Sequence, residues 1–139
     1  MKFQVIYFSR KGSTKKIADG IASELGVNAE TVKIAKLSKD CFIFLGSGCY
    51  GSKPAKIIKK FIENNDFKSR NVALFGTSGG GVGTEVDVME DLLNDKGAYV
   101  KGKFFCKGKF WFGNKDRPNA DDLDGAKKFA KVMIKKSSQ

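Results

Sequence analysis

The sequence contains no histidine among its 139 residues. This absence removes the usual zinc sites and the imidazole base on which Ser-His and Cys-His catalysis depends. The three cysteines are scattered and odd in number, so we expect reduced thiols rather than a disulfide framework. We therefore expect any chemistry that the protein performs to belong to a bound cofactor.

Long apolar runs are also missing. None approaches the ~20 residues of a membrane-spanning helix, and the N-terminus has one lysine followed by a strand pattern, without the layout of a signal peptide. We therefore expect no membrane span and a cytoplasmic location. Hydrophobic residues make up an ordinary 41% of the chain, and its length suits one domain over residues 1–139.

Acidic residues are scarce. The chain has 15 aspartates and glutamates and 26 lysines and arginines, which gives a net charge of +11. Such a balance suggests an acidic partner, nucleic acid or an anionic membrane surface. The lysines fall mostly on the outer faces of expected helices, where solvated faces explain most of them, and no nucleic-acid-binding motif is present. We therefore expect no nucleic acid as a partner.

Apolar runs alternate along the chain with segments of helical periodicity, which predicts an α/β fold with helices on both faces of a parallel sheet. The expected strands are residues 3–8, 31–35, 41–45, 71–76 and 98–106. The expected helices are residues 14–25, a segment with Pro54 in its first turn, a segment from Thr84 to Gly97 with Thr84 and Asp87 as a capping box, and a segment from Asn119.

The connection between the second and third strands is unusually short. Only residues 36–40 separate them, whereas a parallel crossover normally needs a dozen or more residues. We therefore expect the second strand to be a short edge strand. The economical arrangement of the five strands is the order 2-1-3-4-5.

Three loops rich in glycine and serine follow the first, third and fourth strands. In such a sheet, ligands bind beyond the carboxyl ends of the strands, where the strand order reverses. Because the first loop opens a helix, its backbone N–H groups and hydroxyls can hold a phosphate, although it is not a Walker A loop. The candidate ligand-binding residues are Ser9, Arg10, Lys11, Gly12, Ser13 and Thr14 in the first loop, Ser47, Gly48, Cys49, Tyr50 and Gly51 in the second, and Thr77, Ser78, Gly79 and Gly80 in the third.

The first loop resembles the phosphate loop of flavodoxins, which reads Ser/Thr-x-Thr-Gly-Asn-Thr after the first strand. Ser9, Gly12 and Thr14 match that pattern, whereas Lys11 and Ser13 stand where threonine and asparagine are usual. Three further segments resemble the family's flavin-flanking loop, its next strand with the flavin-edge loop, and the opening of its last helix. They are residues 45–51, 72–77 and 117–123.

The resemblance implies a flavodoxin-like three-layer sandwich that binds FMN without a covalent bond and shuttles electrons between redox protein partners. It implies that residues 9–14 hold the phosphate, that residues 47–51 and 77–80 border the flavin ring, and that Tyr50 stacks on it. The third loop lacks the second aromatic residue that many flavodoxins have. Trp111 or a neighbouring phenylalanine could replace it, although Phe104, Phe105, Phe110 and Phe112 can equally be core residues.

The basic charge is a further departure, because familiar flavodoxins are acidic. We therefore expect the partner to present an acidic docking surface. Positive charge also stabilises the anionic reduced flavin, so we expect a less strongly reducing carrier than an acidic flavodoxin.

Other interpretations stay open. Gly46-x-Gly48-x-x-Gly51 has the spacing of a dinucleotide fingerprint, but no acidic residue ends the next strand to bind a ribose. Cys49 is either a redox thiol or a small residue beside the flavin. Asp121, Asp122 and Asp124 match a calcium loop only superficially and suit a first helical turn better. Instead of a carrier, the chain could be a small FMN-dependent NAD(P)H or quinone reductase, or a flavin-free binding module.

Overall fold

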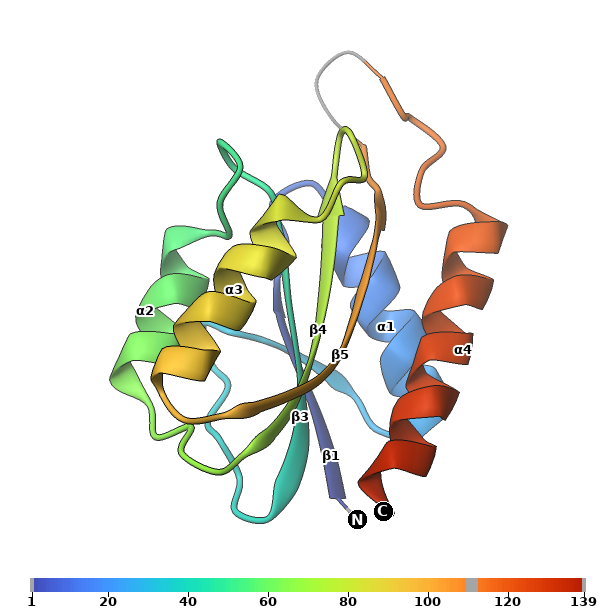
Figure 1. Cartoon of the computed structure of the whole chain (residues 1–139). Helices are drawn as coiled ribbons and strands as arrows, with labels where there is room; N and C mark the ends of the chain where they lie inside the picture. The colour runs from blue at the N-terminus through green and yellow to red at the C-terminus, as the bar shows by residue number, and fades with distance from the viewer. Residues whose placement is uncertain (1, 110–112, 139) are drawn as a thin grey trace.

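The described residues form a parallel sheet that lies between two layers of helices (Figure 1). The computed structural model describes residues 2–109 and 113–138. The strand order is β2-β1-β3-β4-β5, which confirms the predicted order and the three-layer architecture. The strands are β1 (Lys2–Phe8), β2 (Ala29–Thr31), β3 (Cys41–Gly48), β4 (Asn71–Ser78) and β5 (Tyr99–Lys107).

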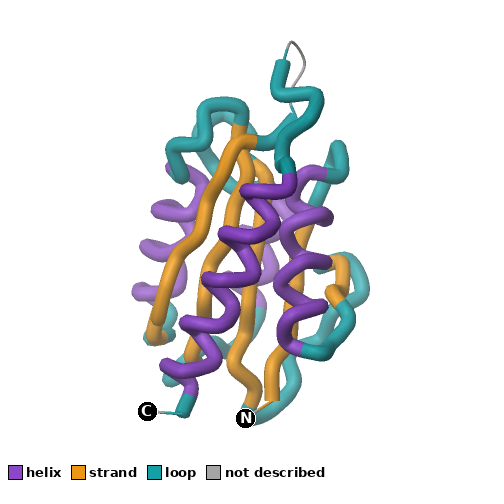
Figure 2. The backbone as a smooth tube through the Cα atoms, turned by 90° about the vertical axis from the view of Figure 1, so that its right-hand side faces the viewer, coloured by secondary structure: helices purple, strands orange, loops and turns teal. Residues whose placement is uncertain are grey.

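Helices cover both faces of the sheet (Figures 1 and 2). α1 and α4 pack on one face, and α2 and α3 pack on the other. Within the part of the chain that the structure describes, no helix is both long enough and apolar enough to cross a membrane. The helices are α1 (Ser13–Leu25), α2 (Lys56–Asn64), α3 (Thr84–Asp95) and α4 (Ala120–Ser137).

Aromatic rings fill the core between the sheet and the pair α1 and α4. Phe42, Phe44 and Phe75 are buried there, because alternate residues of a strand point to opposite faces. Gly46 follows Phe44 on the same face of β3, and a Cβ atom at this position would collide with the Phe75 ring. The absence of a side chain at Gly46 therefore leaves room for the Phe75 ring in the core.

The second strand is shorter and earlier than predicted, at Ala29–Thr31 rather than residues 31–35. The chain turns at Thr31, whose carbonyl accepts hydrogen bonds from the N–H groups of Ile34 and Ala35. The side chain of Gln4 then secures the irregular crossover, since its amide donates to the Lys36 carbonyl at 2.6 Å and its oxygen accepts from the Ser38 N–H at 3.1 Å. These side-chain bonds satisfy backbone groups that a helix would otherwise pair.

α3 begins at Thr84 as predicted, but its predicted capping box and the predicted place of Pro54 in the first turn of α2 are wrong. The N-cap of α3 is Gly83, in the left-handed region at φ 86°, and no side chain caps the helix, so Thr84 and Asp87 form no capping box. Helix α2 begins at Lys56, which leaves Pro54 outside it.

The start of the last helix is confirmed. Asn119 accepts a hydrogen bond from the Asp122 N–H, and the Asp122 side chain accepts one from the Asn119 N–H, which completes a capping box. Asp122 also forms a two-point ion pair with Arg117, and this hydrogen bonding lowers the pKa of the Asp122 carboxyl.

β3 and β4 extend further toward their carboxyl ends than predicted, so Gly46–Gly48 and Thr77–Ser78 belong to strands. Phe104 packs on Phe129 of α4, with ring centroids 5.8 Å apart, as a core residue would. Phe105 does not, because it is 42% exposed on the edge strand β5. Phe110, Trp111 and Phe112 lie outside the described residues.

We predict that Gly46→Ala lowers the free energy of unfolding by about 1–3 kcal/mol, because the added methyl group overpacks the core against Phe75. Denaturant unfolding measures the change. Gly80→Ala is the matched control, since its Cβ would meet only Val82 at an ordinary 3.5 Å. Equal stability of the two variants would contradict the prediction.

Candidate functional site

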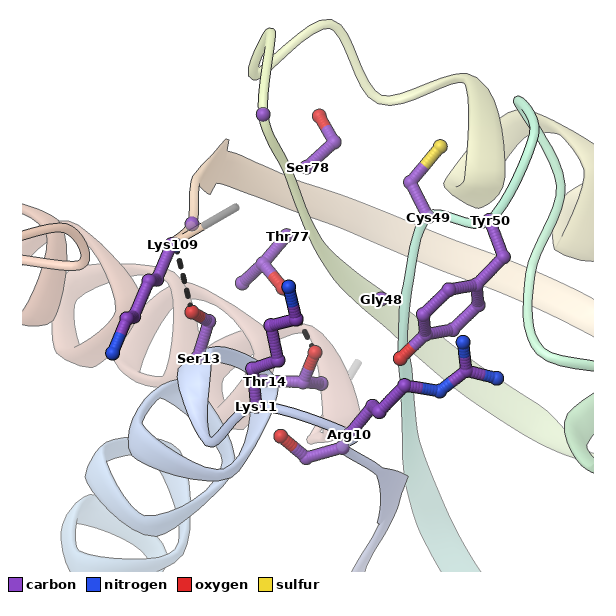
Figure 3. Close-up of a pocket in the computed structure, with 13 residues that line it drawn as sticks. Arg10, Lys11, Ser13, Thr14, Gly48, Cys49, Tyr50, Thr77, Ser78 and Lys109 are labelled. Atoms are coloured by element: carbon purple, nitrogen blue, oxygen red, sulfur yellow. Dashed lines mark hydrogen bonds between the residues drawn. The ribbon is translucent and has the colours of Figure 1, made fainter. Parts of the chain in front are cut away.

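A cavity of ≈ 200 Å³ opens at the carboxyl end of the sheet (Figure 3). Three of its walls come from the loops after β1, β3 and β4, as the strand order predicts. A fourth wall comes from the start of the β5–α4 loop. The lining residues are Ser9, Arg10, Lys11, Ser13, Thr14, Gly48, Cys49, Tyr50, Thr77, Ser78, Gly79, Gly108 and Lys109.

The first wall is the turn from β1 into α1. Gly12 is the N-cap of α1 in the left-handed region, at φ 95°, and its N–H donates to the Ser9 hydroxyl at 3.0 Å. No side chain caps the start of α1. The first-turn N–H groups and the positive end of the helix dipole thus lie beside the cavity, which is the chemistry of an anion site.

Hydroxyl groups join this turn to the neighbouring walls. The Thr14 and Thr77 hydroxyls share a hydrogen bond of 2.8 Å, and both residues are buried. The Ser13 hydroxyl accepts from the backbone N–H of Lys109 at 2.9 Å. Gly108 lies so close to both loops that a Cβ atom there would be 2.9 Å from the Ser13 Cβ and 3.0 Å from the Thr77 Cβ. Gly108 therefore lets three chain segments meet at the bottom of the cavity.

The wall after β3 presents an aromatic ring. A tight turn over residues 50–53 is closed by the Tyr50 N–H, which donates to the Lys53 carbonyl at 2.7 Å, and Gly51 supports it at φ 62°. The Tyr50 ring lies over Gly48, where any Cβ atom would be 2.8 Å from the tyrosine oxygen. The Arg10 guanidinium lies 4.5 Å from the centroid of the Tyr50 ring (Figure 3).

The electrostatic character of the cavity is positive. Arg10, Lys11 and Lys109 belong to its lining, and the described lining residues include no aspartate or glutamate. Burial raises the pKa of the Tyr50 phenol, and the charge of Arg10 acts against this shift. The phenol therefore stays neutral at physiological pH, and the cavity attracts anions.

The structure brings together most of the predicted site residues, but four of them do not line the cavity. Gly12 and Gly51 shape the turns, as described above, and Gly80 lies just beyond the lining residue Gly79. Ser47 is fully buried, where its hydroxyl donates to the Gly48 carbonyl at 2.8 Å and accepts from the Ala55 N–H at 2.9 Å. These bonds connect the end of β3 to the start of α2.

Two lining residues, Gly108 and Lys109, were not predicted. Both residues follow β5. Ligands bind beyond the carboxyl ends of the strands of such a sheet, so the same rule predicts that the loop after β5 also lies at this edge. The segment from Lys107 to Pro118 is rich in aromatic residues and glycine, but its contact with Ser13 spans 96 positions of the chain, which no local pattern reveals.

The chain is similar to known proteins over most of its length. A flavodoxin domain model matches residues 4–113. The chain belongs to the flavodoxin family. An uncharacterised protein of Methanocaldococcus jannaschii is 35% identical to it over 97% of this chain and 99% of its own length. The flavodoxin family implies a flavin cofactor.

Solved flavodoxins share the fold. A flavodoxin from the domain Archaea superposes with a TM-score of 0.81 at 21% identity, covering 100% of both chains. Oxidised flavodoxin 1 of Bacillus cereus gives a TM-score of 0.76 at 19% identity, covering 97% of this chain and 98% of its own.

The cavity residues fit a flavin carrying a phosphate. The cradle at the start of α1 suits the phosphate, and the Tyr50 ring and the glycine backbone at Gly48 and Gly79 suit a flat ring. The cavity's ≈ 200 Å³ is below the roughly 300–1,000 Å³ of pockets that bury most of a ligand, so the cavity would hold only part of a flavin.

One buried acid lies behind this site. Glu85 of α3 is fully buried, and neither carboxylate oxygen has a hydrogen-bond partner among the described residues. Its oxygen lies against Gly76, one residue before Thr77 of the cavity, and would be 2.7 Å from a Cβ atom there. Burial raises the pKa of the Glu85 carboxyl to about 7, against the opposing effect of nearby backbone N–H groups.

We predict that Glu85 makes the protein less stable as pH rises. Its folded pKa of about 7 exceeds the reference value of 4.5, so between these values the folded state binds more protons than the unfolded state. The free energy of unfolding should fall by about 3 kcal/mol across this window and then level off. Glu85→Gln should remove the decline in denaturant titrations from pH 5 to pH 8.

Glu90→Gln is the control for this prediction, because Glu90 is a surface carboxylate 2.9 Å from Lys103. Its loss should change the free energy of unfolding by less than about 1 kcal/mol and leave the pH dependence in place. A wild-type stability that stays flat from pH 5 to pH 8 would contradict the assignment to Glu85.

Proposed function

We propose that this chain binds one FMN without a covalent bond and carries electrons between redox proteins, rather than acting as a stand-alone oxidoreductase. The observation that carries the proposal is the convergence of an anion cradle and an aromatic wall in one cavity, at the carboxyl edge of a flavodoxin-family sheet. When bound, FMN would supply reversible one- or two-electron chemistry.

Each wall has its own part in the proposal. The residues from Ser9 to Thr14 would hold the phosphate, with N–H groups and hydroxyls as donors. Tyr50 would stack on the flavin ring, and the backbone at Gly48 and Thr77–Gly79 would border its polar edge. Cys49 lines the same cavity with its sulfur 3.7 Å from the Thr84 hydroxyl, which suits a small residue beside the ring.

The redox partner is expected to present an acidic docking surface. The cavity mouth carries Arg10, Lys11 and Lys109, and the whole chain has a net charge of +11. Val82, which is 68% exposed in the loop after β4, would add an apolar contact to this charged rim. Charge of this kind speeds encounters with an oppositely charged partner. The cytoplasm remains the predicted location.

The first test is a visible absorption spectrum of the purified protein, followed by titration of the apoprotein with FMN while flavin fluorescence is recorded. We expect flavin bands and quenched fluorescence. Tyr50→Ala should weaken FMN binding about tenfold, because the stacked ring is lost. Tyr99→Ala is the control, since Tyr99 is an aromatic residue 54% exposed on β5 outside the cavity.

Two other outcomes would contradict the proposed function as an electron carrier. Steady oxidation of NAD(P)H by quinone with this protein alone would indicate a reductase. Colourless protein that leaves FMN fluorescence unchanged would remove the redox function and indicate a flavin-free binding module.

We further predict a midpoint potential for the fully reduced flavin that is less negative than in acidic flavodoxins. A unit positive charge ~10 Å away in water-like dielectric contributes ~0.4 kcal/mol, or roughly 20 mV for one electron. Several cations at the mouth should together raise the potential by several tens of millivolts. Spectroelectrochemical titration at low and high salt measures this, and added salt should lower the potential by screening. A very negative, salt-independent potential would contradict the prediction.

A further inference from the structure

The carboxyl of Glu85 is a buried ionisable group that the proposed function leaves unused. It lies in the first turn of α3 and, among the described residues, neither of its oxygens has a hydrogen-bond partner. Gly76 beneath it pairs with Phe105 on β5 and with Ser47 on β3, and paired residues lie on the same face of the sheet. The Phe105 ring is apolar, and the Ser47 hydroxyl already bonds to the Ala55 N–H. This face of the sheet therefore offers the carboxylate nothing to bind.

Two neighbours of Glu85 connect it to the cavity. A carboxylate oxygen would be 2.7 Å from a Cβ atom at Gly76, and the next residue of β4, Thr77, lines the cavity. Because consecutive Cα atoms are about 3.8 Å apart, this oxygen lies within about 8 Å of the Thr77 Cα. The residue before Glu85, Thr84, has its hydroxyl 3.7 Å from the sulfur of Cys49, another lining residue. Protein, in which charges interact more strongly than in water, thus fills much of the space between Glu85 and the cavity.

The ionisable groups around Glu85 do not compensate a charge on it. Asp87 on the same helix raises the pKa of Glu85 further, and Lys103 of β5 is bound by Asp87 at 3.4 Å and by Glu90 at 2.9 Å. Burial raises the pKa of the Cys106 thiol to about 12, so this group stays neutral. β3 and β4 carry no lysine, arginine, aspartate or glutamate. The charged side chains of α2 and of the end of β5 are exposed, namely Lys56, Lys59, Lys60, Glu63 and Lys107.

Glu85 can therefore lose a buried charge only by binding a proton. Its pKa of about 7 means that the carboxyl changes its charge near neutral pH. An anion in the cavity repels the carboxylate, and a flavin that covers the end of β4 removes water from that side, so both effects favour the protonated form. Because such coupling is reciprocal, protonation of Glu85 favours binding of the ligand by the same factor.

We propose that Glu85 is a proton-binding site coupled to the cavity, so that FMN binds more tightly when this carboxyl is protonated and draws a proton onto it when it is not. The proton comes from solvent and forms one O–H bond on the carboxylate, and no bond of the flavin changes. The proposal rests on the proposed function, because it takes FMN as the ligand of the cavity.

The first test counts the protons that the protein exchanges with solvent when FMN binds. Titration calorimetry of the apoprotein at pH 7, in buffers that differ in their enthalpy of ionisation, gives this number. The wild type should take up a few tenths of a proton more than Glu85→Gln, which has a neutral side chain of nearly the same shape. The FMN phosphate also exchanges protons, but it does so in both proteins, and its contribution cancels in the difference.

The second test measures the dissociation constant of FMN by fluorescence quenching at pH 5 and pH 8. The wild type should match Glu85→Gln at pH 5, where the carboxyl is neutral, and should bind FMN about fivefold more weakly than the variant at pH 8. Glu90→Gln is the matched control, because it removes a surface carboxylate from the same helix. This control should follow the wild type at both pH values.

Each remaining outcome decides between the explanations. Wild-type protein that binds FMN with the same proton uptake and the same affinity as Glu85→Gln at both pH values overturns the proposal and leaves the proposed function standing. A change of affinity in Glu85→Gln that is equal at pH 5 and pH 8 overturns it in favour of a role in packing. An equal effect of Glu90→Gln overturns it in favour of a general effect of charge. Wild-type protein that leaves FMN fluorescence unchanged overturns the proposed function as well.

Discussion

The parallel register of β1, β3 and β4 is the constraint on which the site depends. Phe8 at the end of β1 lies opposite Ser47, and Gly48 at the end of β3 lies opposite Thr77. Because the three strands end at nearly the same level, their loops open onto one edge of the sheet. The hydrogen bond between Thr14 and Thr77 then fixes the start of α1 to the end of β4. The cavity is thus a consequence of strand pairing, and the buried contact between the Thr14 and Thr77 hydroxyls holds two of its walls together.

Charge is distributed unevenly around this edge. The cavity lining gathers cations, whereas the carboxyl of Glu85 lies buried behind the end of β4, and burial raises its pKa to about 7. A buried acid without a partner is costly, and residues that break the ordinary rules of folding concentrate near functional sites. The basic lining of the cavity is of the kind that attracts an anionic ligand.

Periodicity and turn chemistry predicted the order of elements well, and the loops after β1, β3 and β4 were correctly placed at one edge. The errors have local physical reasons. β2 lies earlier in the chain than predicted because the chain turns at Thr31. The Gln4 side chain then holds the connection from β2 to β3. Thr84 failed as a cap because Gly83 precedes it in a left-handed conformation. Ser47 was predicted to line the cavity but does not, because its hydroxyl accepts a hydrogen bond at the start of α2.

The sequence by itself determined the α/β alternation, the strand order and the place of the loop between β1 and α1, because these follow from hydrophobic periodicity and from glycine positions that are local in the chain. Only the tertiary structure decided which residues face the cavity. Gly108 and Lys109 reach Ser13 across most of the chain, and Arg10 meets Tyr50 across 40 positions, so no local pattern records either contact. Side-chain direction in a loop depends on packing against distant segments, which folding alone brings together.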